Sequence, residues 1–165
     1  YEVHADKHDL QWIGPQTCVL ATDGGLYRTD DHGASWSDIE DIPVSQFYRV
    51  TWNPHNPGIY TAGAQDNGTT TGSNLAPNEW TRDLGGDGFT SVYHPENSML
   101  RYAGYQWGNW RYSMTSSEQE PIWNDFLSGI DPDDRVWWDA PLAYHPSNPD
   151  MLLTGTQRVL SLIHI

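Results

Sequence analysis

The sequence has few cations and no long apolar run. Among 165 residues, 8 are lysine or arginine and 22 are aspartate or glutamate, which gives a formal net charge of −14 at pH 7. A surface this negative repels phosphate backbones and anionic lipid, so no nucleic-acid partner is expected. No stretch of about 18 consecutive apolar residues occurs, so no membrane insertion is expected in this segment.

Cysteine is also scarce. The only one, Cys18, lies in an apolar run and cannot form an internal disulfide, so we expect a small buried hydrophobe rather than a nucleophile. Aromatic residues, in contrast, are abundant, with 9 Trp and 9 Tyr. So much aromatic surface excludes a disordered acidic coil, and we expect most of the tryptophans to lie in a core between sheets.

An internal repeat occurs three times. Each copy has a proline, a glycine nine positions later and a glutamine two positions after the glycine. The copies contain Pro54, Gly63 and Gln65; Pro95, Gly104 and Gln106; and Pro146, Gly155 and Gln157. A degenerate first copy runs from Trp12 through Pro15 to Asp23, and the prolines are 39, 41 and 51 residues apart. This is the length of a four-stranded β-propeller blade.

Each repeat is predicted to fold as four strands, here called A to D, because helical periodicity is nearly absent and Gly and Pro punctuate the chain. Strand A ends at a turn in which proline fixes φ and asparagine can bond back to the backbone. The predicted fold class is all-β, a β-propeller fragment of about three and a half four-stranded blades.

The predicted propeller domain is residues 1–160, with blades at about 4–40, 43–84, 86–127 and 137–160. The fourth blade is expected to break off after strands at 140–144 and 151–156, and residues 161–165 to be a truncated or artefactual tail. Such a blade stack cannot close a ring, so we expect the rest of the propeller elsewhere in a longer natural chain.

A turn motif identifies the kind of propeller. The segment 29–36 fits the Asp-box pattern Ser/Thr-x-Asp-x-Gly-x-Ser/Thr-Trp. Its fixed positions are Thr29, Asp31, Gly33, Ser35 and Trp36. In a hairpin turn the aspartate can accept backbone N–H bonds, the glycine supplies a positive φ and the tryptophan packs between sheets.

Further motifs extend the likeness: His4-Ala-Asp6-Lys-His8, Asp23-Gly-Gly25, Gln46-Phe-Tyr48-Arg49-Val50, Gly63-Ala-Gln65-Asp66-Asn67-Gly68 and Gly85-Gly-Asp87-Gly88. With the Asp box, they make the chain resemble the Asp-box (BNR-repeat) β-propeller family. It is similar to secreted bacterial BNR-repeat proteins labelled glycosyl hydrolase-like and to the N-terminal propeller of sortilin (VPS10). The resemblance implies an extracellular or cell-surface location, with the signal outside this sequence, and a structural Asp box away from any active site.

The resemblance covers about residues 3–159 and is strongest over 3–108. No good Asp box occupies the turns at 72–77 and 115–120. Xyloglucanases and sialidases also share the box, but the few arginines here form no sialidase-like triad.

Strand direction sorts the polar motifs onto two faces. The A–B and C–D turns lie on one face, and the starts of strand A and the B–C turns lie on the other. To the second face fall His4, Asp6, His8, Asp23, Gln65, Asp66, Asn67, Asp87, Gln106, Trp107, Asn109, Asp139 and Gln157. Because propeller loops commonly bind ligands, this face is the predicted ligand-binding face.

Each motif has an alternative interpretation. His4, Asp6 and His8 alternate with period two and could hold a metal or act as acid and base, or they could tie the lead-in loop by hydrogen bonds. The 65–68 segment could bind sugar hydroxyls or form an Asx-type turn. The 86–88 segment offers a functional carboxylate or a tight D-to-A turn.

Two further groups of residues stay open. Four tryptophans could stack on sugar rings or lie in the core: Trp107, Trp110, Trp137 and Trp138. Three aspartates form a proline-interrupted loop that could be solvated or could bind calcium: Asp131, Asp133 and Asp134. No metal site is assigned, and calcium is the one cofactor considered.

Three functions compete. The favoured one is a recognition propeller that binds a polysaccharide or a protein ligand. The second is a glycoside hydrolase that uses two carboxylates about 5–10 Å apart. Its pool is Asp6, Asp66, Asp87 and Asp139, with Asp87 and Asp66 as the candidate catalytic pair. The third is a structural module of a larger secreted protein.

Overall fold

The computed structural model describes residues 3–40, 42, 45–116, 119–126 and 129–163. Its contacts divide the chain into two compact units, Tyr1–Ser45 and Gln46–Ile165. All regular structure in the described residues is β. None of these residues forms a helix with the length and apolar character needed to cross a membrane.

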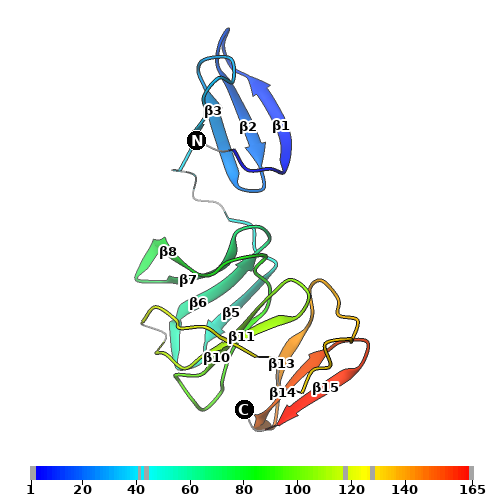
Figure 1. Ribbon diagram of the computed structural model, residues 1–165. Helices are drawn as coiled ribbons and strands as arrows, with labels where there is room; N and C mark the ends of the chain where they lie inside the picture. The colour runs from blue at the N-terminus through cyan, green and yellow to red at the C-terminus, as the bar shows by residue number, and fades with distance from the viewer. Residues whose placement is uncertain (1–2, 41, 43–44, 117–118, 127–128, 164–165) are drawn as a thin grey trace. The chain divides into compact units, whose positions relative to one another are not determined.

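The strands form four antiparallel sheets, and in each sheet neighbouring strands are consecutive in the chain (Figure 1). The first unit holds β1 (Lys7–Trp12), β2 (Cys18–Thr22), β3 (Gly25–Thr29) and β4 (Ser37–Asp38). In the second unit, the first sheet holds β5 (Arg49–Asn53), β6 (Asn56–Ala64), β7 (Gly68–Ser73) and β8 (Ala76–Leu84). The next holds β9 (Ser91–Tyr93), β10 (Arg101–Tyr105), β11 (Asn109–Ser113) and β12 (Asn124–Asp125), and the last holds β13 (Leu142–His145), β14 (Asn148–Gly155) and β15 (Val159–Ile163). The predicted all-β fold of blade-like sheets is confirmed, with four strands in each of the first three sheets and three described strands in the last.

The fourth sheet differs from the prediction that it breaks off after two strands. Ser161–Ile163, expected to lie outside the repeat, belong to β15 and pair with Met151–Leu153 of β14. The apolar and β-branched residues of Val159–Ile163 favour a strand, which is the physical reason for the difference. The last two residues of the predicted tail, 164 and 165, lie outside the described residues.

The A–B turns show why the repeat has its residue pattern. At the last position of strand A, or just after it, a side chain accepts the N–H two residues on: His55 N–H to Asn53 at 2.9 Å, Glu96 N–H to His94 at 3.0 Å and Ser147 N–H to His145 at 3.2 Å. The repeat asparagine makes a second bond of the same kind. These bonds join Gly58 N–H to Asn56 at 3.3 Å, Met99 N–H to Asn97 at 3.0 Å and Asp150 N–H to Asn148 at 3.1 Å. The predicted asparagine turn is confirmed in all three copies.

The 29–36 turn is held by its aspartate. Asp31 accepts the Thr29 hydroxyl at 2.7 Å, the Ser35 N–H at 2.8 Å and the Ser35 hydroxyl at 2.6 Å. Gly33 has φ +88° and donates its N–H to the Thr29 hydroxyl at 2.9 Å. These bonds, led by those from Ser35, lower the pKa of Asp31 from 3.8 to about 2.

The sheets of the second unit pack face to face. Thr51 donates its hydroxyl to the Ser91 carbonyl at 2.7 Å, and the Thr61 and Tyr93 hydroxyls lie 2.5 Å apart. An apolar core joins the last two sheets and contains Leu100, Tyr102, Trp110, Phe126, Ala140, Leu142, Leu152 and Leu162.

Burial was predicted for Cys18 and for most of the tryptophans, and the structure confirms it only for Cys18. Cys18 is a free thiol and only 2% exposed, so its interpretation as a buried hydrophobe is confirmed. The prediction that most tryptophans lie in a core is wrong for this structure. Trp110 is buried, but five of the nine are strongly exposed: Trp12, Trp52, Trp80, Trp107 and Trp137. They lie on sheet faces and in loops, and two of them have a ring beside them: His32 beside Trp12 and Phe47 beside Trp80.

Candidate functional site

The predicted ligand-binding residues fall into two sets, one in each compact unit. His4, Asp6, His8 and Asp23 belong to the first unit, and the remaining predicted residues belong to the second. In both units they lie at the B–C turns or near the start of strand A, as the strand directions predict.

In the first unit, the lead-in segment is tied to the β2–β3 turn. The His8 ring hydrogen bonds to the Asp23 carboxylate, and the Asp23 N–H donates to the Asp6 carbonyl at 3.1 Å. The Asp6 N–H donates to His4 Nδ1 at 3.3 Å. A Cβ on Gly24 would lie 2.8 Å from the His4 ring, so the ring covers the turn closely. This geometry favours the interpretation that these side chains tie the loop.

The repeat glutamines make the corresponding connection in the second unit. Each is the first or second residue after its strand B and accepts a hydrogen bond from the segment leading into its own sheet. Gln65 accepts the Tyr48 hydroxyl at 2.6 Å, Gln106 accepts the Asp87 N–H at 3.0 Å, and Gln157 accepts the Arg135 N–H. The spacing of the glutamines was visible in the sequence, but their hydrogen-bond partners were not.

The candidate catalytic pair is brought together through a backbone N–H. The Asp66 N–H donates to the Asp87 carboxylate at 2.8 Å, and the Gly88 N–H donates to the Ala64 carbonyl at 2.9 Å. Asp66 has φ +62° and Gly68 has φ +78°. Asp87 therefore holds the β6–β7 turn in a conformation that non-glycine residues rarely adopt.

The two asparagines of these turns bond locally. Asn67 Nδ2 donates to the Gln65 carbonyl at 3.0 Å, and Asn109 Nδ2 donates to the Gln106 carbonyl at 2.6 Å. Both bonds brace the B–C turns in which the asparagines lie.

Asp139 pairs with an arginine that sequence reasoning did not assign to the site. The Arg49 guanidinium lies 2.5 Å from the Asp139 carboxylate, and the aspartate side chain is only 16% exposed. This ion pair joins β5 to the segment before β13. Arg49 and Tyr48 belong to the Gln46–Val50 motif, so this motif was the sequence feature that could have pointed to them.

Aromatic rings lie beside this ion pair. The Phe89 and Trp138 centroids are 4.7 Å apart, and Tyr48 lies 5.4 Å from Phe89 and 6.1 Å from Trp138. Of the four tryptophans considered for sugar stacking, Trp138 packs against this cluster and Trp110 is in the core.

Trp107 and Trp137 remain exposed, at 59% and 76%. The Trp107 N–H donates to the Trp138 carbonyl at 3.1 Å, which brings the β10–β11 turn to the 137–139 segment. Trp107 has φ +66°. A bulky residue in this region of φ is strained, and such strain is concentrated at functional positions.

The acidic loop is tied to the β14–β15 turn. Asp134 accepts Gln157 Nε2 at 2.7 Å and the Thr156 hydroxyl at 2.8 Å, and pairs with Arg158 at 2.7 Å. Asp131 accepts the Asp133 N–H at 3.0 Å. A calcium ion in this loop would compete with these donors, and calcium stays a prediction.

No protein-family model matches the chain, and no curated protein is significantly similar to it in sequence. Solved structures do resemble it. The crystal structure of an ancestral GH74 enzyme is 15% identical, with a TM-score of 0.50 over 94% of this chain and 22% of that enzyme. The structure of YCF48 bound to D1 peptide is 12% identical, with a TM-score of 0.47 over 99% of this chain and 66% of that chain.

The likeness to the GH74 enzyme concerns the fold alone, and the chain spans about a fifth of that enzyme's length. Together with the blade-like sheets, it shows that the chain is an all-β protein of the β-propeller class.

Proposed function

We propose that the chain belongs to an Asp-box (BNR-repeat), sortilin-like propeller of the secreted or cell-surface kind. We propose further that it recognises a polysaccharide or a protein ligand at the face of the B–C turns. The 29–36 turn supports the family assignment, because Asp31, Gly33 and Ser35 act there as an Asp box requires.

The observation that carries the ligand face is the conformation of Trp107. Its backbone is in the left-handed region and its indole is 59% exposed. Burying the indole against a ligand would recover apolar contact that the free protein lacks. Trp137, at 76% exposed, offers a second ring. Exposed indole rings can pack against the apolar faces of sugar rings or against side chains of a peptide.

Recognition is favoured over hydrolysis by the state of the carboxylates. Asp87 accepts a backbone N–H and Asp139 is paired with Arg49. A general acid or nucleophile has to reach the scissile bond of the substrate, and these two groups are already used to position turns and strands.

The test is a binding screen on immobilised polysaccharides and glycans, with release of reducing sugar measured in parallel. Trp107→Ala is expected to weaken binding at least about tenfold, as expected for losing one stacked aromatic anchor. Trp52→Ala is the matched control, because Trp52 is 58% exposed but lies in β5 rather than in a turn.

Equal loss in both variants, or none in either, would contradict the proposed face. Sugar release by the unsubstituted chain that is abolished by Asp87→Ala while ligand binding is retained would establish the hydrolase alternative. If no ligand binds and neither variant changes any measured interaction, the chain is a structural module.

A further inference from the structure

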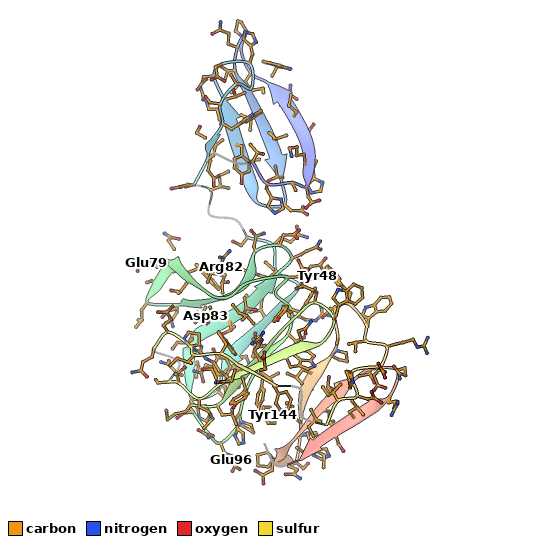
Figure 2. All side chains as sticks on the ribbon, in the orientation of Figure 1. Tyr48, Glu79, Arg82, Asp83, Glu96 and Tyr144 are labelled. Atoms are coloured by element: carbon orange, nitrogen blue, oxygen red, sulfur yellow. The ribbon has the colours of Figure 1, made fainter. Side chains whose placement is uncertain are left out.

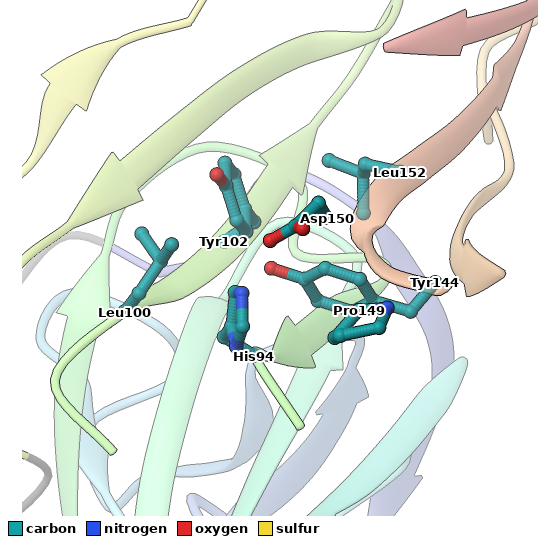
Figure 3. A pocket seen from close by; sticks show the side chains of 7 residues that line it. All are labelled: His94, Leu100, Tyr102, Tyr144, Pro149, Asp150 and Leu152. Atoms are coloured by element: carbon teal, nitrogen blue, oxygen red, sulfur yellow. The ribbon is translucent and has the colours of Figure 1, made fainter. Parts of the chain in front are cut away.

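A cavity of about 360 Å³ lies between the last two sheets, at the A–B turns (Figure 3). It is lined by His94, Leu100, Tyr102, Tyr144, Pro149, Asp150 and Leu152. We call it the A–B cavity. It is at the opposite end of the strands from the B–C turns. Figure 2 shows this separation within the second unit, with Tyr48 near one end and Glu96 and Tyr144 toward the other.

Three aromatic rings form walls of the A–B cavity. The His94 and Tyr144 centroids are 5.2 Å apart with planes at 70°, and the Tyr102 and Tyr144 centroids are 6.2 Å apart with planes at 67°. Each pair meets edge to face, and all three residues line the cavity. Aromatic π-systems beside a space attract a cation that enters it.

The charge of the cavity comes from Asp150, an exposed aspartate at the start of β14. His94 Nδ1 accepts the N–H groups of Glu96 at 3.0 Å and Asn97 at 2.9 Å, which places the proton of the neutral ring on Nε2. Burial raises the pKa of Tyr102 to about 12 and also raises the pKa of Tyr144, so both rings are neutral phenols. Among the described residues of the lining, Asp150 is the only acidic one and none is lysine or arginine.

The A–B cavity thus combines three aromatic rings, the aliphatic residues Leu100, Pro149 and Leu152, and one carboxylate, that of Asp150.

We propose that the A–B cavity binds a small organic cation, an alkylammonium or methylated ammonium group. The aromatic rings favour a cation over an anion, the aliphatic residues contact its alkyl groups, and Asp150 balances its charge. This site is separate from the proposed ligand face and does not depend on it.

The test uses the purified protein, choline as the cationic probe and 3,3-dimethylbutan-1-ol as its uncharged isostere. Both are titrated by NMR, following the resonances of the A–B cavity residues. Choline is expected to bind at least about tenfold more tightly than the alcohol, since about 1.4 kcal/mol of cation–π and ionic attraction corresponds to that ratio.

Asp150→Asn is expected to weaken choline binding at least about fivefold, while Glu96→Gln leaves it within about twofold. Glu96 is an exposed carboxylate on a neighbouring A–B turn and does not line the cavity. The Asp150 substitution keeps the backbone N–H bond to Asn148, and circular dichroism checks its fold.

A second variant, Tyr144→Leu, removes a ring and leaves the carboxylate. It should weaken choline binding without changing the affinity for the alcohol. Equal affinity for choline and the alcohol would show an apolar cavity only and would overturn the proposal. So would the absence of saturable shifts at the cavity residues up to roughly 50 mM choline, the weak limit of useful cation binding.

Discussion

Hydrogen bonds accepted by single side chains fix the turns of this protein. In the three A–B turns of the second unit, the same two positions accept backbone N–H groups two residues further along the chain. The first position is asparagine in one turn and histidine in two, because either can present an acceptor at this reach. The residue types of the repeat are therefore constrained by turn chemistry and carry no evidence of catalysis.

The hydrogen bonds to Asp31 predict how the stability of the first unit depends on pH. Its pKa is about 2 in the folded protein and ordinarily 3.8, chiefly because Ser35 donates two hydrogen bonds to it. A lowered folded pKa stabilises the fold above the unfolded pKa, and this contribution is lost as the pH falls through about 2. Asp31→Asn should lower the thermal midpoint at neutral pH and flatten its dependence between about pH 4 and pH 2.

The control for Asp31 is Glu40→Gln, which neutralises an exposed carboxylate of the same unit. It should leave the acid dependence of the first unit unchanged, as hydrogen exchange of residues 3–40 can report. Identical acid profiles for Asp31→Asn and the unsubstituted chain would contradict the role given to this aspartate.

Local features of this kind could be predicted from the sequence. The positive φ of Gly33 and Gly68 and the asparagine turns depend on residues only two to four positions apart. The partners of Asp139 and Asp87 could not be predicted in the same way. Arg49 is 90 residues from Asp139, and their contact depends on how the sheets pack. For the same reason, repeat spacing located the glutamines but left their partners unknown.

At the scale of elements, the sheets are held together by close backbone approach. A Cβ on Gly63 of β6 would lie 2.2 Å from the Phe89 carbonyl oxygen, and a Cβ on Gly88 would lie 2.0 Å from the Gly68 carbonyl oxygen. No side chain can be accommodated at these distances without moving one sheet. The repeat glycine at position 63 is thus required by packing between sheets.

Gly63→Ala should destabilise the second unit by about 1–3 kcal/mol, the usual range for overpacking a core position. Chemical unfolding followed by tryptophan fluorescence measures this loss. Gly85→Ala is the matched control, because a Cβ there meets nothing within 4 Å. A similar loss of stability in both variants would mean that the conformational freedom of glycine, and not the close backbone approach, explains the destabilisation.

A buried ion pair joins β8 and β10. The Arg101 guanidinium lies 3.5 Å from the Asp83 carboxylate, and the two side chains are 5% and 4% exposed. Asp83 also accepts the Thr71 hydroxyl at 2.6 Å, and Arg101 lies over the Trp123 ring at 5.6 Å. Burial still raises the pKa of Asp83, although Arg101 opposes the shift.

Arg101→Met should cost about 3–5 kcal/mol at neutral pH, because it leaves the Asp83 charge buried without a cation. Losing the arginine raises the folded pKa of Asp83 further. For a raised pKa, stability is fully present below the ordinary value of 3.8 and is lost as the pH rises through the folded value. The cost should therefore shrink as the pH is lowered in denaturant unfolding.

Arg28→Met provides the control for this pair. It removes a cation from an ion pair with Asp30 in which both side chains are about half exposed, at 46% and 61%. Exposed pairs add little to stability, so its unfolding midpoint should stay close to that of the unsubstituted chain. A pH-independent loss in Arg101→Met would show that packing on Trp123, and not charge, explains the effect.

At the scale of the whole molecule, the excess of carboxylates dominates. With 22 acidic and 8 basic side chains, most carboxylates have no cation to pair with. Ion pairs such as Arg49–Asp139 stabilise particular contacts, whereas the net charge of −14 opposes compact structure by repulsion. Salt screens both, but repulsion between unpaired carboxylates acts over longer distances and is therefore screened more strongly.

Raising the NaCl concentration from about 10 mM to about 150 mM should consequently raise the thermal midpoint at neutral pH, because the Debye length falls from about 30 Å to about 8 Å. Near pH 4.5, where the net charge of the sequence is close to zero, the same change should have little effect. Differential scanning calorimetry at both pH values measures the two responses. A midpoint that falls with salt at neutral pH would show that attraction within ion pairs outweighs the repulsion of the unpaired carboxylates.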